Sequence, residues 1–316
     1  MFFNLVKKGR NELWQYVFTI ILIALGYFIG QIPLTALLLK KMDKDPSLGQ
    51  DELTELMANP DFSSWGIDNN LGFLMLLLMF IFATIGLYSG IRFLHKKKIK
   101  DLITPNPRID YSKILWAFGV WFLLGLIFEA AMYFYVPDNY AYTFNIKKFI
   151  PLVLIAFLIL PIQTSFEELV FRGYFMQGFG SVLKNRWAPL IITSMLFGAI
   201  HGTNPEIEKY GMGIMQAYYI TAGVVLGIMT IMDDSLELAL GVHAGTNIYG
   251  AIVLSYEGAA IQTDTIVKTA NMNPVHLYIV FLISALIFLL MCSKKFNWKS
   301  WDYLFSKIEF DDTAIA

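Results

Sequence analysis

The stretch FIPLVLIAFLILPIQTSFEELVFRGYF, residues 149–175, carries no charged side chain before Glu167, and then places Glu167, Glu168 and Arg172 close together. A run of this length is long enough to cross a bilayer as a helix, which takes about 20 apolar residues. Ionisable groups within such a helix are costly and mark functional sites by default. This stretch is therefore the first candidate for both a membrane-spanning helix and a functional site.

The composition of the whole chain indicates a polytopic membrane protein. Its 316 residues are 56% hydrophobic and 16% charged, with a mean hydropathy of +0.55, whereas soluble domains carry about 25% charged residues. The formal net charge is −1, so no nucleic-acid partner is expected. Cys292 is the single cysteine, which excludes a disulfide framework.

Apolar runs predict about eight transmembrane helices. The first run follows basic residues as a signal peptide would, but it is far longer than a signal h-region of about 7–15 residues, so we interpret it as an uncleaved helix. Shorter runs at 187–201 and 236–254 complete the eight. The longer runs cover 14–39, 71–94, 114–136, 149–175, 214–232 and 275–293.

Basic residues assign the two sides of the membrane. With eight spans the basic segments fall on one side, which the positive-inside rule makes the cytoplasm. The sequence thus predicts an all-α, multi-pass integral membrane protein with both termini in the cytoplasm, in the inner (plasma) membrane if the source is bacterial. The basic segments are 7–10, 95–100, 184–186 and 294–299.

Three regions are expected along the chain. Residues 1–140 hold three helices and an acidic extracytoplasmic loop with a short helix near residues 51–57, and residues 141–260 hold a helical core. Residues 261–316 hold the last span and a cytoplasmic amphipathic tail. Both chain ends mix Trp, Phe and Lys, which is typical of interfacial helices and equally of aromatic-belt anchors.

Glu168 and Arg172 are four residues apart, so on a helix they share a face and can pair. Glu167 is rotated by roughly 100° about the same helix and points elsewhere. The spacing predicts that Arg172 neutralises Glu168 while Glu167 faces a cavity. The alternative is an Arg172 that snorkels to the cytoplasmic surface, with both acids at the interface.

The position of His201 favours the cavity. If the chain turns at 184–186, the arms from Glu167 to the turn and from the turn to His201 are equal, at about 25 Å each. An antiparallel hairpin then brings His201 level with Glu167. Residues 187–201 would end at this depth, where HGTNP breaks the helix. A lone buried histidine, in contrast, is usually a packing residue.

A third helix contributes GVHAGTN, in which His243 and Asn247 lie one turn apart on one face. One Glu and two His form a common ligand set for catalytic zinc. Without metal, the same Glu can act as general base on a water held by histidine. Asn247 would be a further ligand or an oxyanion donor. The metal-dependent and metal-free routes both remain open.

Three motifs carry a family resemblance. EELVFR (167–172) matches EExxxR, FGAIH (197–201) matches FxxxH, and HAGTN (243–247) matches HxxxN. In order and spacing they resemble the CAAX protease and bacteriocin-processing family (CPBP), also called the ABI or type II CAAX prenyl endopeptidase family. The resemblance covers about residues 149–255. Glu129 lies outside the motifs and is interpreted as a carboxylate facing the cavity or the interface.

The resemblance implies an intramembrane endopeptidase, in a family commonly called metalloproteases, whose helical core opens to the cytoplasm. Glu167 would activate water, and His201, His243 and Asn247 would complete the site, with or without zinc. Glu168 and Arg172 would form a supporting pair. The expected partner is a membrane-associated peptide or protein substrate.

Two other functions compete with the peptidase. Buried Glu and His also serve proton relays, which would make the protein a transporter or ion pathway. The same cavity could also bind a toxin or membrane peptide without catalysis, as in an immunity protein.

Overall fold

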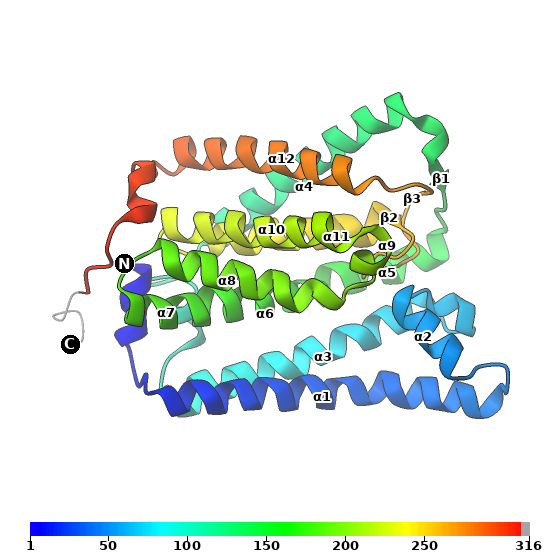
Figure 1. The fold of residues 1–316 in the computed structure, drawn as a ribbon, viewed down its shortest axis with the longest axis horizontal. Helices are drawn as coiled ribbons and strands as arrows, with labels where there is room; N and C mark the ends of the chain where they lie inside the picture. Colours follow the sequence, from blue (N-terminus) through cyan, green and yellow to red (C-terminus); the bar gives the residue numbers. More distant parts are fainter. Residues whose placement is uncertain (311–316) are drawn as a thin grey trace.

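The computed structural model describes residues 1–310, and helices running roughly along one direction make up most of it (Figure 1). Within these residues, six helical segments are long and apolar enough to cross a membrane, which confirms the predicted all-α polytopic membrane protein. These segments are α1 (Leu13–Lys44), α3 with a π-helical continuation (Asn69–Leu94), α4 (Tyr111–Tyr135), the interrupted helix Ile146–Leu183, α10 (Met212–Met232) and α12 (Pro274–Lys295).

Two shorter helices complete the bundle. They are α8 (Trp187–Ile200) and α11 (Glu237–Ile252). With 14 residues, α8 is about 21 Å long, which is less than the roughly 30 Å hydrocarbon core. It ends in a 3₁₀ turn, His201–Thr203, whose residues are partly or fully exposed. The number of eight spans therefore stays a prediction.

The stretch that begins with residue 149 forms an interrupted helix. Its parts are α5 (Ile146–Leu158), α6 (Leu160–Glu168), a π-helical segment η6 (Leu169–Phe175) and α7 (Met176–Leu183). Pro161 explains the first break, because it lacks an N–H and its ring clashes with the residue four positions earlier. The π segment follows Glu168 directly, and such segments are frequent at functional sites.

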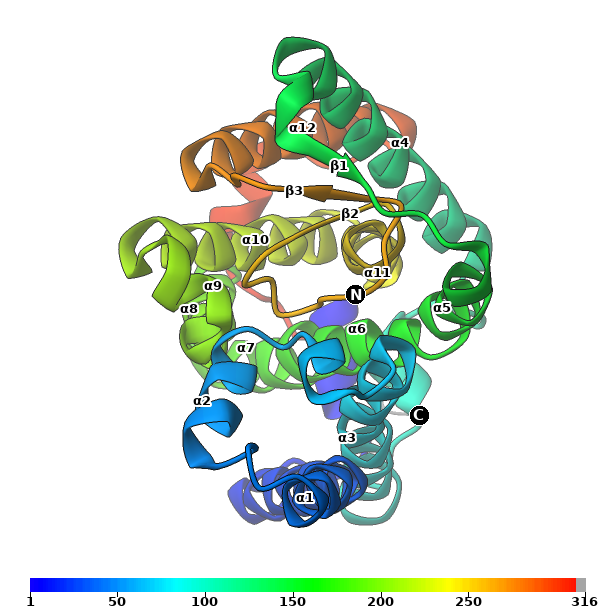
Figure 2. The same ribbon diagram turned by 90° about the vertical axis from the view of Figure 1, so that its right-hand side faces the viewer.

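One end of the bundle, called the sheet end, carries a small sheet that the sequence did not predict (Figures 1 and 2). The strand order is β1-β3-β2, with β3 antiparallel to β1 and parallel to β2. Two short helices lie at the same end, and α2 corresponds to the helix expected near 51–57. The elements are β1 (Tyr140–Tyr142), β2 (Leu254–Tyr256), β3 (Val267–Thr269), α2 (Gln50–Ala58) and α9 (Pro205–Tyr210).

The opposite end, called the basic end, holds the N-terminus and the last described residues (Figure 1). Two 3₁₀ helices, η1 (Phe2–Lys7) and η8 (Trp301–Phe305), pack into one apolar cluster with α7, α8 and α10. Phe2 and Leu304 are buried there, so both segments pack against the bundle. Residues 311–316 of the predicted tail lie outside the described residues.

Helix α11 occupies the middle of the bundle, between α4 and α6 (Figure 2). It approaches α4 so closely that a Cβ on Gly241 would lie 2.3 Å from the backbone oxygen of Ile114. Only glycine fits at this contact. The tight packing fixes the position of His243, one half-turn further along α11.

Candidate active site

The two adjacent acids of α6 face different surroundings. Glu168 is fully buried, and its Oε1 accepts a hydrogen bond of 2.8 Å from Nη1 of Arg172. Arg172 is also fully buried; its Nη2 donates to the backbone oxygen of Gly223, and its guanidinium lies 4.3 Å from the ring centroid of Phe197. Arg172 does not snorkel to the surface, because its charge is paired within the bundle.

Glu168 has a second contact that the sequence did not predict. Its Oε1 lies 2.7 Å from Nδ1 of His243. A carboxylate can only accept, so Nδ1 of His243 carries the proton and donates it to Glu168. In the neutral ring, Nε2 is then left with a free lone pair. Glu168 therefore joins Arg172 of its own helix to His243 of α11.

His201 is oriented in a similar way at the end of α8. Its Nδ1 lies 2.7 Å from the backbone oxygen of Phe197, which can only accept. The ring stacks on Tyr219 of α10, with centroids 4.4 Å apart and planes inclined by 25°. These contacts fix the tautomer and the plane of the ring, and they leave Nε2 of His201 free as an acceptor.

Glu167 lies opposite both free nitrogens. Its Oε2 is 3.6 Å from Nε2 of His243 and 4.0 Å from Nε2 of His201. This oxygen is buried and has no hydrogen-bond partner. The separations are too long for direct hydrogen bonds but suit one atom placed between the three groups, as a water would be.

The other oxygen of Glu167 is held by a residue that the sequence analysis missed. Nε2 of Gln163 donates to Oε1 of Glu167, and Nδ2 of Asn247 donates to Oε1 of Gln163, over 3.0 Å. Gln163 thus links the predicted Asn247 to Glu167. The available signal was a glutamine four residues before Glu167, on the same helix face in an apolar run.

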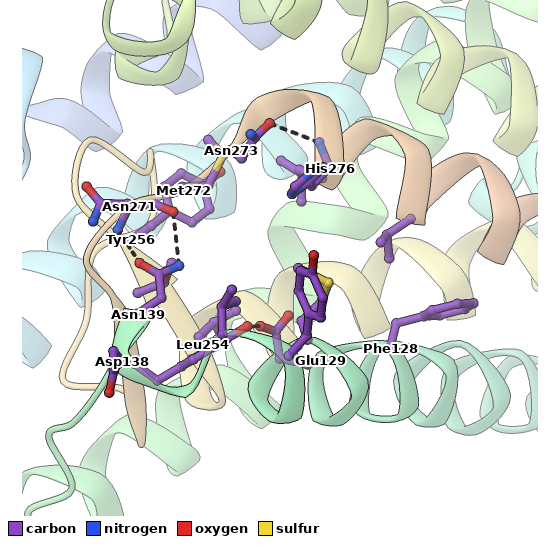
Figure 3. A pocket seen from close by; sticks show the side chains of 17 residues that line it. Phe128, Glu129, Asp138, Asn139, Leu254, Tyr256, Asn271, Met272, Asn273 and His276 are labelled. Carbon is purple, nitrogen blue, oxygen red and sulfur yellow. Dashed lines mark hydrogen bonds between the residues drawn. The ribbon is translucent and has the colours of Figure 1, made fainter.

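The four predicted residues Glu167, His201, His243 and Asn247 line one cavity of about 460 Å³. The cavity continues from Glu167 to the sheet end, where Leu254 and Ser255 of β2 form part of its wall. A second cavity of about 530 Å³ adjoins it between α4, the sheet and α12 (Figure 3). Glu129 lines both cavities and accepts a hydrogen bond from Tyr140.

Glu206 of α9 is a further carboxylate of the first cavity that the sequence analysis did not select. It is buried, and its Oε1 accepts a hydrogen bond of 2.7 Å from the backbone N–H of Ala260. Burial raises the pKa of Glu206, and the hydrogen bond from Ala260 opposes this shift. Glu206 and Glu208 in the short segment before an apolar helix match no motif by which to find this site residue.

The donor atoms suit a zinc ion in their chemistry, since two imidazole nitrogens and one carboxylate oxygen face one point. In residues 1–310, however, no three His, Cys, Asp or Glu side chains are grouped closely enough to hold a metal ion. The amide nitrogen of Asn247 points toward Gln163, to which it donates a hydrogen bond. We therefore derive no reaction step through a metal.

Fold and site together define a multi-pass membrane protein with a polar cavity, lined by carboxylate and imidazole groups, inside its helical bundle. The model of the family described as "Type II CAAX prenyl endopeptidase Rce1-like" matches residues 146–249, which include all three motifs. The uncharacterized protein YyaK of Bacillus subtilis (strain 168) is 31% identical over 243 residues, covering 77% of this chain and 78% of YyaK.

A second relative is the UPF0177 protein YbdI of Lactococcus lactis subsp. lactis (strain IL1403). It is 28% identical over 137 residues, covering 40% of this chain and 68% of YbdI. No solved structure gives a significant match. The chain belongs to the Rce1-like type II CAAX prenyl endopeptidase family. This membership identifies it as a CAAX-type protease of the membrane.

Proposed function

We propose that the protein is an intramembrane endopeptidase in which Glu167 activates a water for attack on a peptide bond. The observation that carries the proposal is the unpartnered Oε2 of Glu167, which faces Nε2 of both His201 and His243 across 3.6 and 4.0 Å. A water between them has two hydrogens and would donate to two of these three acceptors at a time. The family of the chain supports the same chemistry.

The reaction needs one proton acceptor and one proton donor, and Glu167 serves as both. Its Oε2 takes a proton from the water while the water oxygen bonds to the carbonyl carbon of the substrate. Gln163 holds the other oxygen of Glu167 and so aims the carboxylate. Collapse of the tetrahedral intermediate breaks the C–N bond, and the proton on Glu167 passes to the leaving amine.

Asn247 is proposed to stabilise the developing oxyanion. One N–H of its amide is used on Gln163, and the second is available for the substrate oxygen. A donor of this kind is typically worth about 2.7–4 kcal/mol in the transition state. Glu168 and Arg172 are proposed as positioning residues, because Glu168 holds His243 in the tautomer with a free Nε2.

A bound zinc ion would supply Lewis acidity and lower the pKa of the same water. Glu167, His201 and His243 offer the donor atoms for it, but they would have to move closer together than they lie in residues 1–310. Metal analysis separates the two routes. One equivalent of zinc that is lost in His243→Ala, together with inactivation by a chelator, would assign the metal route. Activity that survives chelation in metal-free protein would assign the route through Glu167 and water alone.

The transporter alternative finds less support in the distribution of polar groups. The charged side chains of the first cavity, Glu129, Glu167 and Glu206, extend from its middle to the sheet end. At the basic end the bundle is filled by an apolar cluster that includes Phe2, Met176 and Ile231. A continuous polar path through both leaflets is therefore not expected.

Peptide cleavage in proteoliposomes tests the proposal. We would reconstitute the purified protein, add a mixture of peptides of mixed sequence, and read the products by mass spectrometry. The wild type is expected to release fragments cut within the chain, and Glu167→Gln is expected to release none at equal thermal stability. Identical fragments from both proteins would contradict the assignment. Protection of cells from a toxin that survives Glu167→Gln would instead favour the immunity protein.

A further inference from the structure

The segment that follows α8 folds back onto one tyrosine of α10. This segment is HGTNPE, residues 201–206, and three of its polar side chains meet Tyr219. His201 stacks its ring on the ring of Tyr219. Asn204 and Glu206 meet the hydroxyl group at the other end of the same side chain. Since none of the three motifs contains Tyr219, its role has to be found from these contacts.

The hydroxyl group of Tyr219 has a partner on each side. Its oxygen accepts a hydrogen bond of 3.0 Å from Nδ2 of Asn204, which leaves the phenol proton for an acceptor. Glu206 offers one, because its Oε2 is buried and has no direct hydrogen-bond partner within residues 1–310. Burial raises the pKa of Glu206, and the backbone of Ala260 and the hydroxyl of Tyr219 oppose this shift. The carboxyl and the phenol therefore lie close together.

Close packing of α8 on α10 sets the distance between the two stacked rings. The helices lie side by side (Figures 1 and 2). A Cβ on Gly198 of α8 would lie 2.4 Å from Cγ1 of Ile220, and a Cβ on Gly223 of α10 would lie 2.9 Å from Cα of Ser194. Small residues on both helices thus allow the backbones to approach. The stack is therefore fixed by the packing of the bundle as well as by the segment 201–206.

The orientation of the His201 ring decides which of its nitrogens faces Glu167. Nδ1 donates to the backbone oxygen of Phe197, and Nε2 lies 4.0 Å from Oε2 of Glu167. Half a turn of the ring about its Cβ–Cγ bond would exchange the two nitrogens. The ring would have to leave the plane of Tyr219, which lies at a centroid distance of 4.4 Å and an inclination of 25°. A firmly held Tyr219 therefore opposes this exchange.

We infer that Tyr219 is a positioning residue of the site. Held between Asn204 and Glu206, it keeps the ring of His201 in the orientation that directs Nε2 toward Glu167. Asn204 and Glu206 act through Tyr219, so no chemical step is assigned to them. The effect on cleavage rests on the proposed peptidase function, whereas the effect on the orientation of His201 does not.

Solid-state NMR of the protein in liposomes tests the orientation of His201 without any need for catalysis. The chain has four histidines, so ¹⁵N labelling of histidine gives few signals, and His201→Gln assigns those of His201. The nitrogen shifts show which ring nitrogen carries the proton. Tyr219→Leu removes the stack and the hydroxyl, and Tyr219→Phe removes the hydroxyl alone. Tyr278→Phe is the matched control, because its phenol is hydrogen-bonded over 2.8 Å to Thr221 of the same helix α10.

We expect His201 to carry its proton on Nδ1 in the wild type and in Tyr278→Phe. In Tyr219→Leu a second set of His201 signals, with the proton on Nε2, should appear, and in Tyr219→Phe the same set should appear at a smaller share. His201 signals in Tyr219→Leu that match the wild type would overturn the inference, and so would an equal second set in Tyr278→Phe. If Tyr219→Leu does not fold, Tyr219→Phe decides, and a spectrum identical to the wild type then overturns it.

Peptide cleavage by the same variants tests the consequence for the reaction. Loss of the aromatic pair in Tyr219→Leu should lower kcat by about 10-fold, and loss of one neutral hydrogen bond in Tyr219→Phe by about 3-fold, with KM nearly unchanged. Adding Asn204→Ala to Tyr219→Phe should cost little more, because both changes break one contact. A wild-type kcat in Tyr219→Leu would contradict the positioning role. A wild type that cleaves no peptide would contradict the proposed function alone, since the NMR result does not depend on cleavage.

Discussion

At the residue scale, two neighbouring glutamates have different surroundings because a helix turns by about 100° per residue. Glu168 is enclosed with Arg172 and His243, and Glu167 faces the cavity with one oxygen unpartnered. The sequence predicted this division from the spacing of Glu168 and Arg172 together with the expected depth of His201. It could not predict that Glu168 also contacts His243 or that Gln163 holds Glu167, because both contacts depend on how α6 and α11 pack.

Gln163 gives the first prediction. Gln163→Leu removes the hydrogen bond to Oε1 of Glu167 and also the acceptor of Asn247. A hydrogen bond to a charged group is worth about 1.5–3 kcal/mol, so kcat should fall by about 10- to 100-fold. The measurement is the cleavage rate of a responsive peptide in proteoliposomes. An unchanged rate would show that Glu167 needs no such support.

Glu168 gives a prediction about stability. Glu168→Gln leaves the Arg172 guanidinium buried without its counter-charge, which should destabilise the protein by about 3–5 kcal/mol. The double variant Glu168→Gln/Arg172→Met removes both charges and should recover most of the loss. Thermal unfolding in detergent measures both effects. If Glu168→Gln alone were as stable as the wild type, Glu168 would not be the group that neutralises the charge of Arg172.

At the element scale, the site depends on helices that end, break or pack where the sequence has a specific reason. Pro161 interrupts the helix ahead of Glu167, and α8 ends at Ile200, next to His201. The sequence predicted the end of α8, because HGTNP cannot continue a helix. It did not predict the π segment after Glu168. It also did not predict the small sheet, because strands of three residues are too short to show an alternation of apolar and polar side chains.

The close packing of α11 on α4 gives a prediction with an internal control. In Gly241→Ala the new Cβ would collide with the backbone of Ile114, whereas Gly250→Ala on the same helix meets nothing within 4 Å. Gly241→Ala should lower both the midpoint of thermal unfolding and the cleavage rate, because it shifts His243. Gly250→Ala should leave the midpoint unchanged. Equal behaviour of the two variants would show that α11 is free to move.

At the scale of the whole molecule, the apolar cluster of η1, η8, α7, α8 and α10 lies at the basic end of the bundle, and the small sheet lies at the opposite end. The sequence predicted the order and the approximate positions of the apolar helices, since hydropathy reports them directly. It did not predict that η1 and η8 fold back over the basic end. That arrangement depends on contacts between residues some 300 positions apart, such as Phe2 and Leu304 in one apolar cluster.

Lys97, which is buried at the basic end, gives a prediction about pH. Burial lowers the pKa of Lys97 to about 8, while Asp101 raises it and Lys8 lowers it further. Between this pKa and the unfolded value, the folded state binds fewer protons than the unfolded state, so stability should rise with pH from about 8 to about 10.4. Lys97→Met should be more stable than the wild type at pH 7, and the difference should shrink by pH 9.5. Thermal unfolding across this range measures it, and a constant difference would contradict the account.

The central claim is that Glu167 performs the chemistry of this cavity and that the other carboxylates do not. The most direct test is the cleavage rate of one responsive peptide by Glu167→Gln and by Glu129→Gln, two identical changes in the same cavity. We predict that Glu167→Gln loses about 10²- to 10⁴-fold in rate, as expected for a general base, while Glu129→Gln stays within a few-fold of the wild type. Equal rates for the two variants would contradict the claim.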